Sequence, residues 1–402
     1  MERRRVLVAV SGGIAAYKVP ELIRCLVRAG HTVRCVVTDA ASHFVSPLVL
    51  QALCGSPVRS QLFDASEESE IDHVALADWA DIVVLAPATA NTLARLANGL
   101  ADDLVSTTLL ATRAPLLAAP AMNVNMWRHP ATRENVGRLR DRGVRFIGPE
   151  SGALACGWEG EGRMSEPETI AAEIELCLGP RSLTSTRVVV TAGGTREPID
   201  SVRALTNRSS GKMGFAIAAE AARRGAETVL VAGPSALSTP QSVRRVDVET
   251  ALEMREAVLA EMPTASVLVM AAAVADFRPS KPATTKIRKE DLGDSAPVIE
   301  LVRNPDILAE ICAQPRDGRI VVGFAAEDRD VLETARRKLA RKGCDLLVAN
   351  DVSRTDGGFD SDRNAVIFVR PGGEAEELPL LAKAEVAARL WDLIEKLRGS
   401  SA

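Results

Sequence analysis

Two stretches of this chain share one pattern, a short apolar run that ends on a pair of glycines. The first occupies residues 5–13 and the second residues 187–194. A run of Val and Leu is typical of a strand buried on both faces, and a glycine pair is typical of a tight turn where the backbone approaches a ligand. In open α/β sheets, ligands bind at such strand-to-helix turns. The pattern therefore predicts two α/β domains, each with a nucleotide-type site of its own.

Length, charge and cysteine usage narrow the class of protein. A chain of 402 residues allows two or three domains with cores of their own. A net charge of -4, without a basic tract that carries aromatics, argues against nucleic-acid binding. The seven cysteines form no Cys-x-x-Cys motif, which favours reduced thiols. The apolar run that follows residues 1–5 is too short for a signal peptide or a membrane span. We therefore expect a cytoplasmic protein with no membrane partner.

Short apolar strands alternate with helical stretches in the first half. Strands are predicted at residues 5–10, 32–37, 81–86, 115–119 and 144–147. This alternation predicts a mostly parallel sheet flanked by helices, a Rossmann-like domain over residues 1–178. A helix over 168–178 ends at Gly179-Pro180, so we expect a linker at 179–186 and a second domain at 187–402.

Three segments of the first half are candidates for a site. Residues 11–14, Ser-Gly-Gly-Ile, lack the spaced glycines of dinucleotide binding, yet they can offer backbone N–H groups to a phosphate. A turn that simply needs glycine is the alternative. Residues 120–127 combine amides with Met and Trp directly after a strand, either lining a crevice or capping the core. Residues 151–164 are glycine-rich around Cys156, which indicates a flap that carries a reactive group or an inert buried thiol.

Taken together, these motifs resemble the flavin-dependent phosphopantothenoylcysteine decarboxylases. The shared motifs are Ser-Gly-Gly-Ile at 11–14, Ile-Asp-His-Val at 71–74, Ala-Pro-Ala-Thr-Ala-Asn-Thr at 86–92, Pro-Ala-Met-Asn-x-x-Met-Trp at 120–127 and Ala-Cys-Gly at 155–157. The resemblance covers residues 6 to about 176. It implies FMN as cofactor, because loss of CO2 from this substrate would otherwise leave a carbanion with no electron sink. In the family, FMN oxidises the substrate thiol, and the reduced flavin later converts the enethiol to the saturated thiol.

The resemblance also assigns roles to single residues. It implies that Asn123 holds the substrate carboxylate or amide and that Cys156 is the proton donor of the final reduction. His73 would act near the flavin as an acid/base or orienting group. The implied flavin contacts are Ser11, Gly12, Gly13, Ile14, Thr38 and Ser106.

The sequence pattern of the second half also predicts an α/β domain. Strands are predicted at residues 187–191, 228–232, 266–270, 319–323 and 345–349, with helices between them. The Gly-Lys pair at 211–212 does not form a P-loop, because residue 206 is not glycine and Met213 replaces the hydroxyl residue. Asp276 follows a predicted strand, at the end where sites form. Lys338 and Lys342 share one helix face, which without further context is most often a solvated surface.

The second half resembles the phosphopantothenate–cysteine ligases. The shared motifs are Asn-x-Ser-Ser-Gly-Lys-Met-Gly at 207–214, Ala-Ala-Val-Ala-Asp-Phe at 272–277, Lys-x-x-Lys at 286–289, Asn-Pro-Asp-Ile at 304–307, Gly-Phe-Ala-Ala-Glu at 323–327 and Ala-Asn-Asp at 349–351. The resemblance covers most of 187–395. It implies that CTP activates 4'-phosphopantothenate as an acyl-cytidylate, which releases pyrophosphate. The cysteine amine then displaces CMP.

This second resemblance implies a cation-lined nucleotide site with Mg2+ as counter-ion. Lys286 would neutralise charge at the α-phosphate, and Asn207 would hydrogen-bond the acyl-cytidylate. The implied nucleotide-binding residues are Asp276, Lys286, Asn304, Pro305, Asp306, Ile307, Phe324, Lys338 and Lys342. Arg288 stands where the family often has lysine, and arginine differs in geometry and cannot be deprotonated. The sequence assigns neither a role to Arg288 nor ligands to the metal.

The two resemblances together predict a bifunctional enzyme of coenzyme A biosynthesis. Its partners would be the small molecules 4'-phosphopantothenate, cysteine and CTP. They also imply a homo-oligomer, trimer-based and often a dodecamer, with paired ligase domains. One alternative is a flavin- or nicotinamide-dependent oxidoreductase with a regulatory second domain, although the spaced glycine fingerprint is missing. A second alternative is a flavin-binding regulatory module without catalysis.

Overall fold

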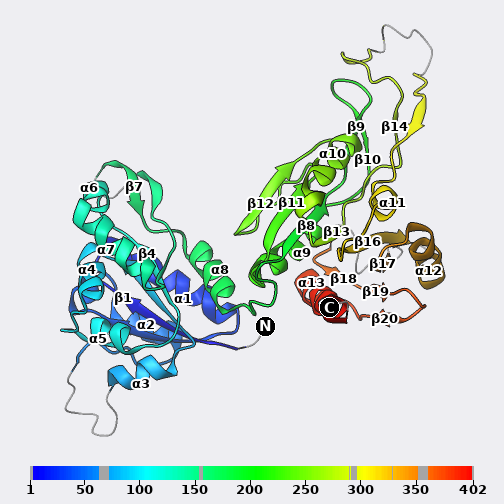
Figure 1. Cartoon of the computed structure of the whole chain (residues 1–402). Coiled ribbons are helices and arrows are strands. Elements are labelled where there is room, and N and C mark those ends of the chain that lie inside the picture. The colour runs from blue at the N-terminus through cyan, green and yellow to red at the C-terminus, as the bar shows by residue number, and fades with distance from the viewer. Residues whose placement is uncertain are drawn as a thin grey trace. The chain divides into compact units, whose positions relative to one another are not determined.

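The computed structural model describes residues 3–62, 72–153, 157–288, 290, 297–327, 329–351 and 361–400. The chain forms two compact units, Met1–Gly179 and Pro180–Ala402 (Figure 1). No helix in the described ranges is both long and apolar enough to cross a membrane. Each unit is an α/β layer structure, so the predicted fold class is confirmed.

The first unit is built on a five-stranded parallel sheet. Its order is β2-β1-β3-β4-β5. The strands are β1 (Arg5–Val10), β2 (Thr32–Val37), β3 (Ile82–Ala88), β4 (Leu116–Pro120) and β5 (Arg145–Phe146). Strand order reverses between β1 and β3, and crevices at such a reversal bind ligands in sheets of this kind.

Helices cover both faces of this sheet. They are η1 (Ile14–Lys18), α1 (Val19–Arg28), η2 (Asp39–His43), α2 (Pro47–Cys54), α3 (Asp72–Trp79), α4 (Ala90–Asn98), α5 (Leu104–Ala111), α6 (Val124–Arg128), α7 (Pro130–Asp141) and α8 (Pro167–Leu178). Residues from α1, α2 and α8 form the core on one face, and residues from α3, α4, α5 and α7 form the core on the other. A hairpin of β6 (Glu150–Ala153) and β7 (Glu159–Arg163) stands apart from the sheet.

The second unit contains an eight-stranded sheet of order β12-β11-β8-β13-β16-β17-β19-β20. Its strands are β8 (Arg187–Ala192), β11 (Glu227–Ala232), β12 (Val243–Asp247), β13 (Val267–Met270), β16 (Ile320–Glu327), β17 (Leu346–Asp351), β19 (Val366–Val369) and β20 (Ala375–Glu377). The first six in this order are parallel, and β19 and β20 pair antiparallel. Strand order reverses between β8 and β13, which marks the second expected crevice.

Helices and short strand pairs complete the second unit. The helices are α9 (Lys212–Arg223), α10 (Ala251–Glu261), η3 (Met262–Thr264), α11 (Ile307–Cys312), α12 (Val331–Lys342) and α13 (Lys383–Ser400). The pairs are β9 (Arg196–Pro198) with β10 (Ala204–Thr206), β14 (Phe277–Pro279) with β15 (Leu301–Arg303), and β18 (Arg363–Asn364) with β21 (Leu381–Ala382). In Figure 1, β9, β10 and β14 project together from the body of this unit.

The segment between the two glycine-pair domains packs on the second unit. Leu183 is fully buried in that unit's core, and its N–H donates to the carbonyl of Arg224 at 2.9 Å. The hydroxyl of Thr186 accepts a hydrogen bond from Arg398 at 2.7 Å. Residues 183–186 are therefore tied to α9 and α13.

Candidate active sites

The first unit contains a cavity of about 820 Å³ along the carboxyl edge of its sheet. The walls come from the turns that follow β1, β2, β3 and β4, together with η1 and the end of β7. The main polar and glycine residues of the lining are Gly12, Gly13, Lys18, Thr38, Asp39, Thr89, Asn91, Thr92, Arg95, Asp102, Asp103, Asn123, Gly162 and Arg163. Backbone turns, hydroxyls and three cations can together hold a phosphorylated ligand at this edge.

Glycine is required at the first turn by a close approach of two backbones. A Cβ atom on Gly12 would lie 2.4 Å from Cβ of Ala40 and 2.8 Å from its carbonyl carbon. The turn is also fixed from the other side, because the hydroxyl of Ser11 donates to the carbonyl of Pro87 at 2.6 Å and accepts from the N–H of Thr89 at 3.1 Å. The turns after β1 and β3 are thus held together at the reversal point.

The β6–β7 hairpin forms part of the wall and is anchored at two points. The N–H of Met122 donates to the carbonyl of Gly162 at 3.0 Å. The buried Lys18 ammonium donates to the carbonyl of Met164 at 3.1 Å and to Glu166 at 3.0 Å. The Lys18 hydrogen bond also lowers the pKa of the Glu166 carboxyl. These contacts tie the helix that follows the glycine turn to the return strand of the hairpin.

The second unit contains a cavity of about 800 Å³. It lies along the carboxyl ends of β13, β16 and β17 and the N-terminal end of α9. The lining includes residues 207–214 and 270–277, residues 303–308, Phe324, Ala325, Ala326, Lys338, Arg341, Lys342, Asn350, Asn364 and Lys383. Amide side chains, two carboxylates and several cations therefore face one space.

Two amides at this edge are held by the backbone after β13. The Asn207 side chain donates to the carbonyls of Ala273 and Val274, at 3.3 and 3.1 Å. The Asn304 side chain donates to the carbonyl of Ala275 at 2.8 Å. Both amides are thereby fixed beside the Ala-Ala-Val-Ala-Asp segment.

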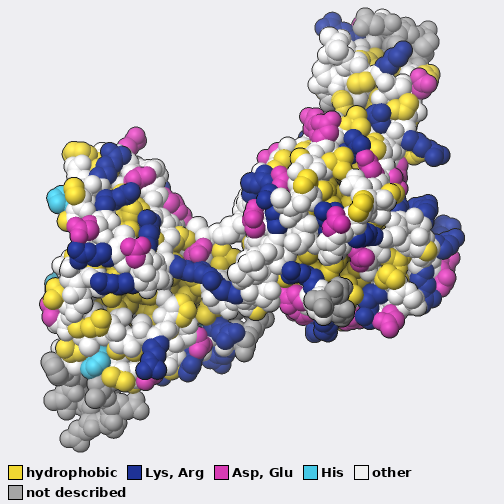
Figure 2. All heavy atoms as spheres, viewed as in Figure 1, with side chains coloured by type: hydrophobic (Ala, Val, Ile, Leu, Met, Phe, Trp, Pro, Cys, Tyr) yellow, Lys and Arg dark blue, Asp and Glu magenta, His cyan; other side chains and the backbone are white. Residues whose placement is uncertain are grey.

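Cations from α12 meet carboxylates at the other end of the cavity. Lys342 pairs with Asp306, and Lys338 pairs with Glu327 at 2.6 Å. Burial would raise the pKa of Asp306, but its bonds from Lys342 and from the Ala309 N–H outweigh that effect, so the pKa is lowered. Figure 2 shows Lys and Arg side chains gathered over α12 on the face that it draws. This end of the cavity suits a polyanion.

Family models match both units. Residues 1–178 match the flavoprotein family, and residues 183–397 match the DNA/pantothenate metabolism flavoprotein C-terminal domain. The coenzyme A biosynthesis bifunctional protein CoaBC of Vibrio cholerae is 47% identical over 393 residues, which cover 98% of each chain. This chain belongs to the bifunctional coenzyme A biosynthesis family. It is thus a decarboxylase and a ligase, with a flavoprotein decarboxylase unit followed by the ligase unit.

Solved structures resemble each unit separately. The C-terminal domain of a coenzyme A biosynthesis bifunctional protein CoaBC is 41% identical, with a TM-score of 0.47, and the match covers 55% of this chain and 99% of that one. The FMN-binding protein AtHal3 is 36% identical, with a TM-score of 0.40, over 44% of this chain and 96% of that one.

The decarboxylase cavity brings together some of the residues expected from the sequence. Gly12, Gly13, Ile14, Thr38 and Asn123 line it. Ser11 directly precedes the lining residue Gly12. Ser106, in the first turn of α5, donates its hydroxyl to the carboxylate of the N-cap residue Asp103, which itself lines the cavity. His73 lies on α3, outside the lining residues of its own chain. Cys156 falls outside the described residues.

Lys18 and Arg95 also line this cavity, although the sequence did not single them out. Lys18 lies five residues after the glycine pair. This short spacing from the glycine turn is the sequence feature that could have indicated its place in the cavity. Arg95 pairs with Asp103 at 2.5 Å and Asp102 at 3.1 Å. No local pattern marks that arginine, because the fold alone brings α4 and α5 together.

The ligase cavity collects all but one of the nucleotide-site residues expected from the sequence. Asn207, Asp276, Asn304, Pro305, Asp306, Ile307, Phe324, Lys338 and Lys342 line it. Lys286 does not line this cavity, and its side chain is exposed in the connector between β14 and β15.

Two buried asparagines in the ligase cavity were not selected from the sequence. Asn350 is the last residue but one of β17, and Asn364 lies on β18. The side-chain oxygen of each is buried without a hydrogen-bond partner among the described residues. An unsatisfied buried acceptor is costly, so these atoms are suited to a ligand donor or to water. Asn350 belongs to the Ala-Asn-Asp motif, which could have indicated it. Asn364 belongs to none of the motifs found in the sequence.

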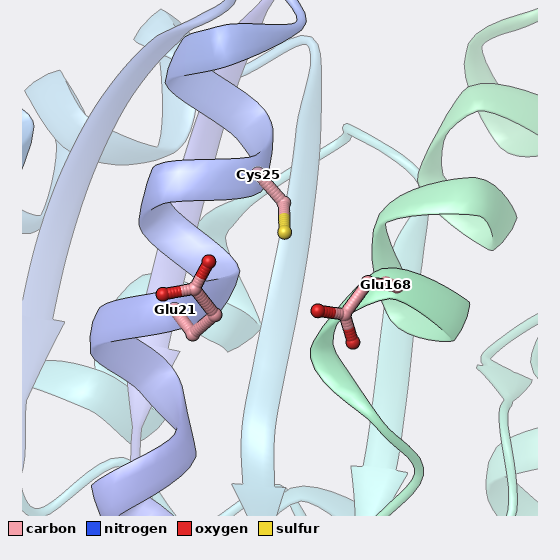
Figure 3. Close-up of side chains that lie close together, drawn as sticks. All are labelled: Glu21, Cys25 and Glu168. Atoms are coloured by element: carbon pink, nitrogen blue, oxygen red, sulfur yellow. The ribbon is translucent and has the colours of Figure 1, made fainter.

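A group of possible metal ligands lies away from both cavities. Glu21 and Cys25 on α1 and Glu168 on α8 place their ligand atoms within 4.8 Å of one another (Figure 3). Glu21 already pairs with Arg24 and Arg28. Burial, followed by the charges of both glutamates, raises the pKa of the Cys25 thiol, which disfavours the thiolate that binds metals. The ion pairs of Glu21 and the raised pKa of the thiol make this group poorly suited to a metal ion.

Replacing Gly12 with alanine is expected to weaken flavin binding. The new methyl group would force the first turn away from Ala40, and overpacking of this kind costs about 1–3 kcal/mol. If that cost falls on the flavin-binding conformation, it corresponds to a loss of affinity of about 5- to 150-fold. Titration of the apo-protein with FMN, followed by flavin fluorescence, would measure the change.

Gly137 provides the matched control for this substitution. It lies on α7, and a Cβ atom there meets nothing within 4 Å. Gly137→Ala should therefore bind flavin as the unmodified protein does. Equal affinity in Gly12→Ala would show that the close approach to Ala40 does not shape the flavin site.

Proposed function

We propose that the ligase unit joins cysteine to 4'-phosphopantothenate by way of an acyl-cytidylate, and that the decarboxylase unit uses FMN to convert the product to 4'-phosphopantetheine. The observation that carries the proposal is the coincidence of motif and cavity in both units. The most specific motifs of each resemblance, at 120–127 and at 207–214, both contribute to a cavity wall.

The decarboxylase cavity has features that fit FMN. It opens at the β1/β3 reversal, and glycine is needed there for close backbone approach. Backbone N–H groups after β1, with Thr38, would hold the cofactor phosphate. When bound, FMN supplies the electron acceptor that makes loss of CO2 feasible. Asn123 would orient the substrate carboxylate or amide, and Cys156 would give the proton of the last step.

His73 and Lys286 both lie outside the cavities of their own chain. Such positions fit sites completed by neighbouring subunits of the homo-oligomer that the resemblance implies. We therefore propose a homo-oligomer, based on trimers of the decarboxylase unit and dimers of the ligase unit. His73 would then act near the flavin of a neighbouring chain.

The ligase cavity has donors for a nucleoside triphosphate and its metal. Lys338 and Lys342 would hold phosphate oxygens, and Lys286 would neutralise charge at the α-phosphate. Asn207 would hydrogen-bond the acyl-cytidylate, and Phe324 would contact the nucleotide. Asp276 and Asp306 are the carboxylates among the described residues of the lining. Two carboxylates fit Mg2+ that is held largely by substrate phosphates.

A coupled assay with the full chain tests the proposal. 4'-Phosphopantothenate, cysteine, CTP and Mg2+ should yield CMP, pyrophosphate and CO2 without NAD(P)H. A purified protein that is yellow from FMN is expected as well. A colourless protein, or a need for nicotinamide cofactor, would favour the oxidoreductase alternative. We propose the cytoplasm as its location, because the sequence has no paired-cysteine pattern.

A further inference from the structure

A buried carboxylate anchors the turn between β9 and β10. The Asp200 side chain is fully buried. It accepts hydrogen bonds from the N–H groups of Val202 and Arg203, each at 2.8 Å, and from Nε of Arg203 at 2.9 Å. The second guanidinium nitrogen, Nη2, also bonds to it. One carboxylate thus fixes both the turn and the orientation of the arginine.

Asp200 and Arg203 also bind the backbone of the connector that contains Lys286, through contacts to Ile287 that we call the grip. The N–H of Ile287 donates to Oδ2 of Asp200 at 3.1 Å, and Nη2 of Arg203 donates to the carbonyl of Ile287 at 2.8 Å. Both backbone polar groups of Ile287 are therefore bound by the turn. A further backbone bond, from Ala283 to the carbonyl of Ile199 at 2.9 Å, lies just before this grip.

This grip matters because regular secondary structure does not hold the described part of the connector in place. It runs between the end of β14 at Pro279 and the start of β15 at Leu301, with no helix or strand in its described part. The Lys286 side chain is exposed, so contacts along that side chain do not hold it in a fixed place. A catalytic cation must nevertheless be positioned to within a fraction of an ångström to be effective. The backbone bonds at Ile287 fix the residue next to it.

The grip is also electrostatically stable. The hydrogen bonds from Arg203, together with the backbone N–H donors, hold the pKa of Asp200 far below its usual range. The carboxylate therefore stays charged at neutral pH and keeps accepting all of its hydrogen bonds.

We propose that Asp200 is a positioning residue for the ligase reaction, which acts by fixing the backbone beside Lys286. The proposal rests on the role proposed above for Lys286. Asp200 itself does not line the ligase cavity, so it acts through the connector and not on the substrates.

The test is a double-mutant cycle in the full-length protein. Asp200→Asn keeps the size of the side chain but replaces one carboxylate oxygen with an NH2 group. This donor cannot accept a hydrogen bond from the N–H of Ile287 or from the guanidinium of Arg203. We expect CTP- and 4'-phosphopantothenate-dependent pyrophosphate release to fall by up to about 100-fold, as for a displaced catalytic group. The double variant Asp200→Asn/Lys286→Gln should be no slower than Lys286→Gln alone, because residues that act as a unit are not additive.

A second variant keeps the test valid if Asp200→Asn does not fold. Ile287→Pro removes the N–H that Asp200 accepts and leaves the buried carboxylate intact. Its rate should fall by a similar factor. Glu261→Gln is the matched control, since Glu261 also binds two arginines, Arg187 and Arg244, away from the cavity. That variant should keep the original rate.

Three results would overturn the inference. A normal rate in Asp200→Asn or in Ile287→Pro would show that the grip does not influence the reaction. A double variant much slower than Lys286→Gln would show that Asp200 acts independently of Lys286. A normal rate in Lys286→Gln would remove the proposed role of Lys286 itself, and the inference about Asp200 would fall with it.

Discussion

Lys286→Gln is expected to lower CTP-dependent pyrophosphate release by about 100- to 1,000-fold, the usual effect of removing one group that stabilises transition-state charge. Activation of the carboxylate places charge on the α-phosphate and on the departing pyrophosphate. Glutamine keeps the length of the side chain approximately but provides no positive charge. The rate should be measured with 4'-phosphopantothenate and CTP, by enzymatic detection of pyrophosphate.

Lys281 offers the control, because it is an exposed lysine in the same connector. Lys281→Gln should release pyrophosphate at the original rate, which shows that a general change in surface charge is not responsible. Decarboxylation of supplied 4'-phosphopantothenoylcysteine should also be unchanged in Lys286→Gln, since that reaction belongs to the other unit. Normal pyrophosphate release in Lys286→Gln would exclude this lysine from the mechanism.

Cys156→Ser is expected to lower formation of 4'-phosphopantetheine by about 100- to 10,000-fold, the range typical of losing a general acid. A serine hydroxyl is a much weaker acid than a thiol, so proton delivery in the last step should fail. Flavin binding should persist, because Cys156 is not expected to hold the cofactor. Absorbance of bound flavin and mass spectrometry of the accumulated product measure the two effects separately.

Cys25 is a suitable comparison for this substitution. It is a half-buried thiol on α1, away from the flavin cavity. Cys25→Ser should keep both flavin and turnover. If Cys156→Ser formed product at the original rate, another group would have to deliver the proton, and the flavin-binding module without catalysis would regain support.

The central strands of both sheets could be predicted because they are fully buried. Residues 6–10 of β1 and 188–192 of β8 are apolar or small and inaccessible, so they appear as uninterrupted apolar runs. The edge strand β12, with sequence Val-Arg-Arg-Val-Asp, was not predicted. Its exposed position at the sheet edge allows charged residues. The strand therefore shows no hydrophobic pattern from which it could be predicted. The antiparallel strands β19 and β20 were also not predicted, because they are only four and three residues long and β20 is fully exposed.

The sites show the same division between local and tertiary information. Motifs located Gly12, Asn123 and Asn207, because each stands at a strand end where the chain itself forms the cavity wall. The sequence did not reveal Asn364, which reaches the ligase cavity from a short strand far along the chain. It also gave no sign that Asp200 grips Ile287, since 87 residues separate the two. Contacts of that range depend on topology and leave no spacing pattern.

The burial of Leu183 has a practical consequence for dividing the protein. Its side chain fills space among residues of the ligase core, and Thr186 is bonded to the last helix. A separately expressed ligase half that starts at the glycine-pair strand would lose this cover and expose apolar surface. Such a fragment should begin at Pro180, and a truncation that starts at Arg187 is expected to melt at a lower temperature.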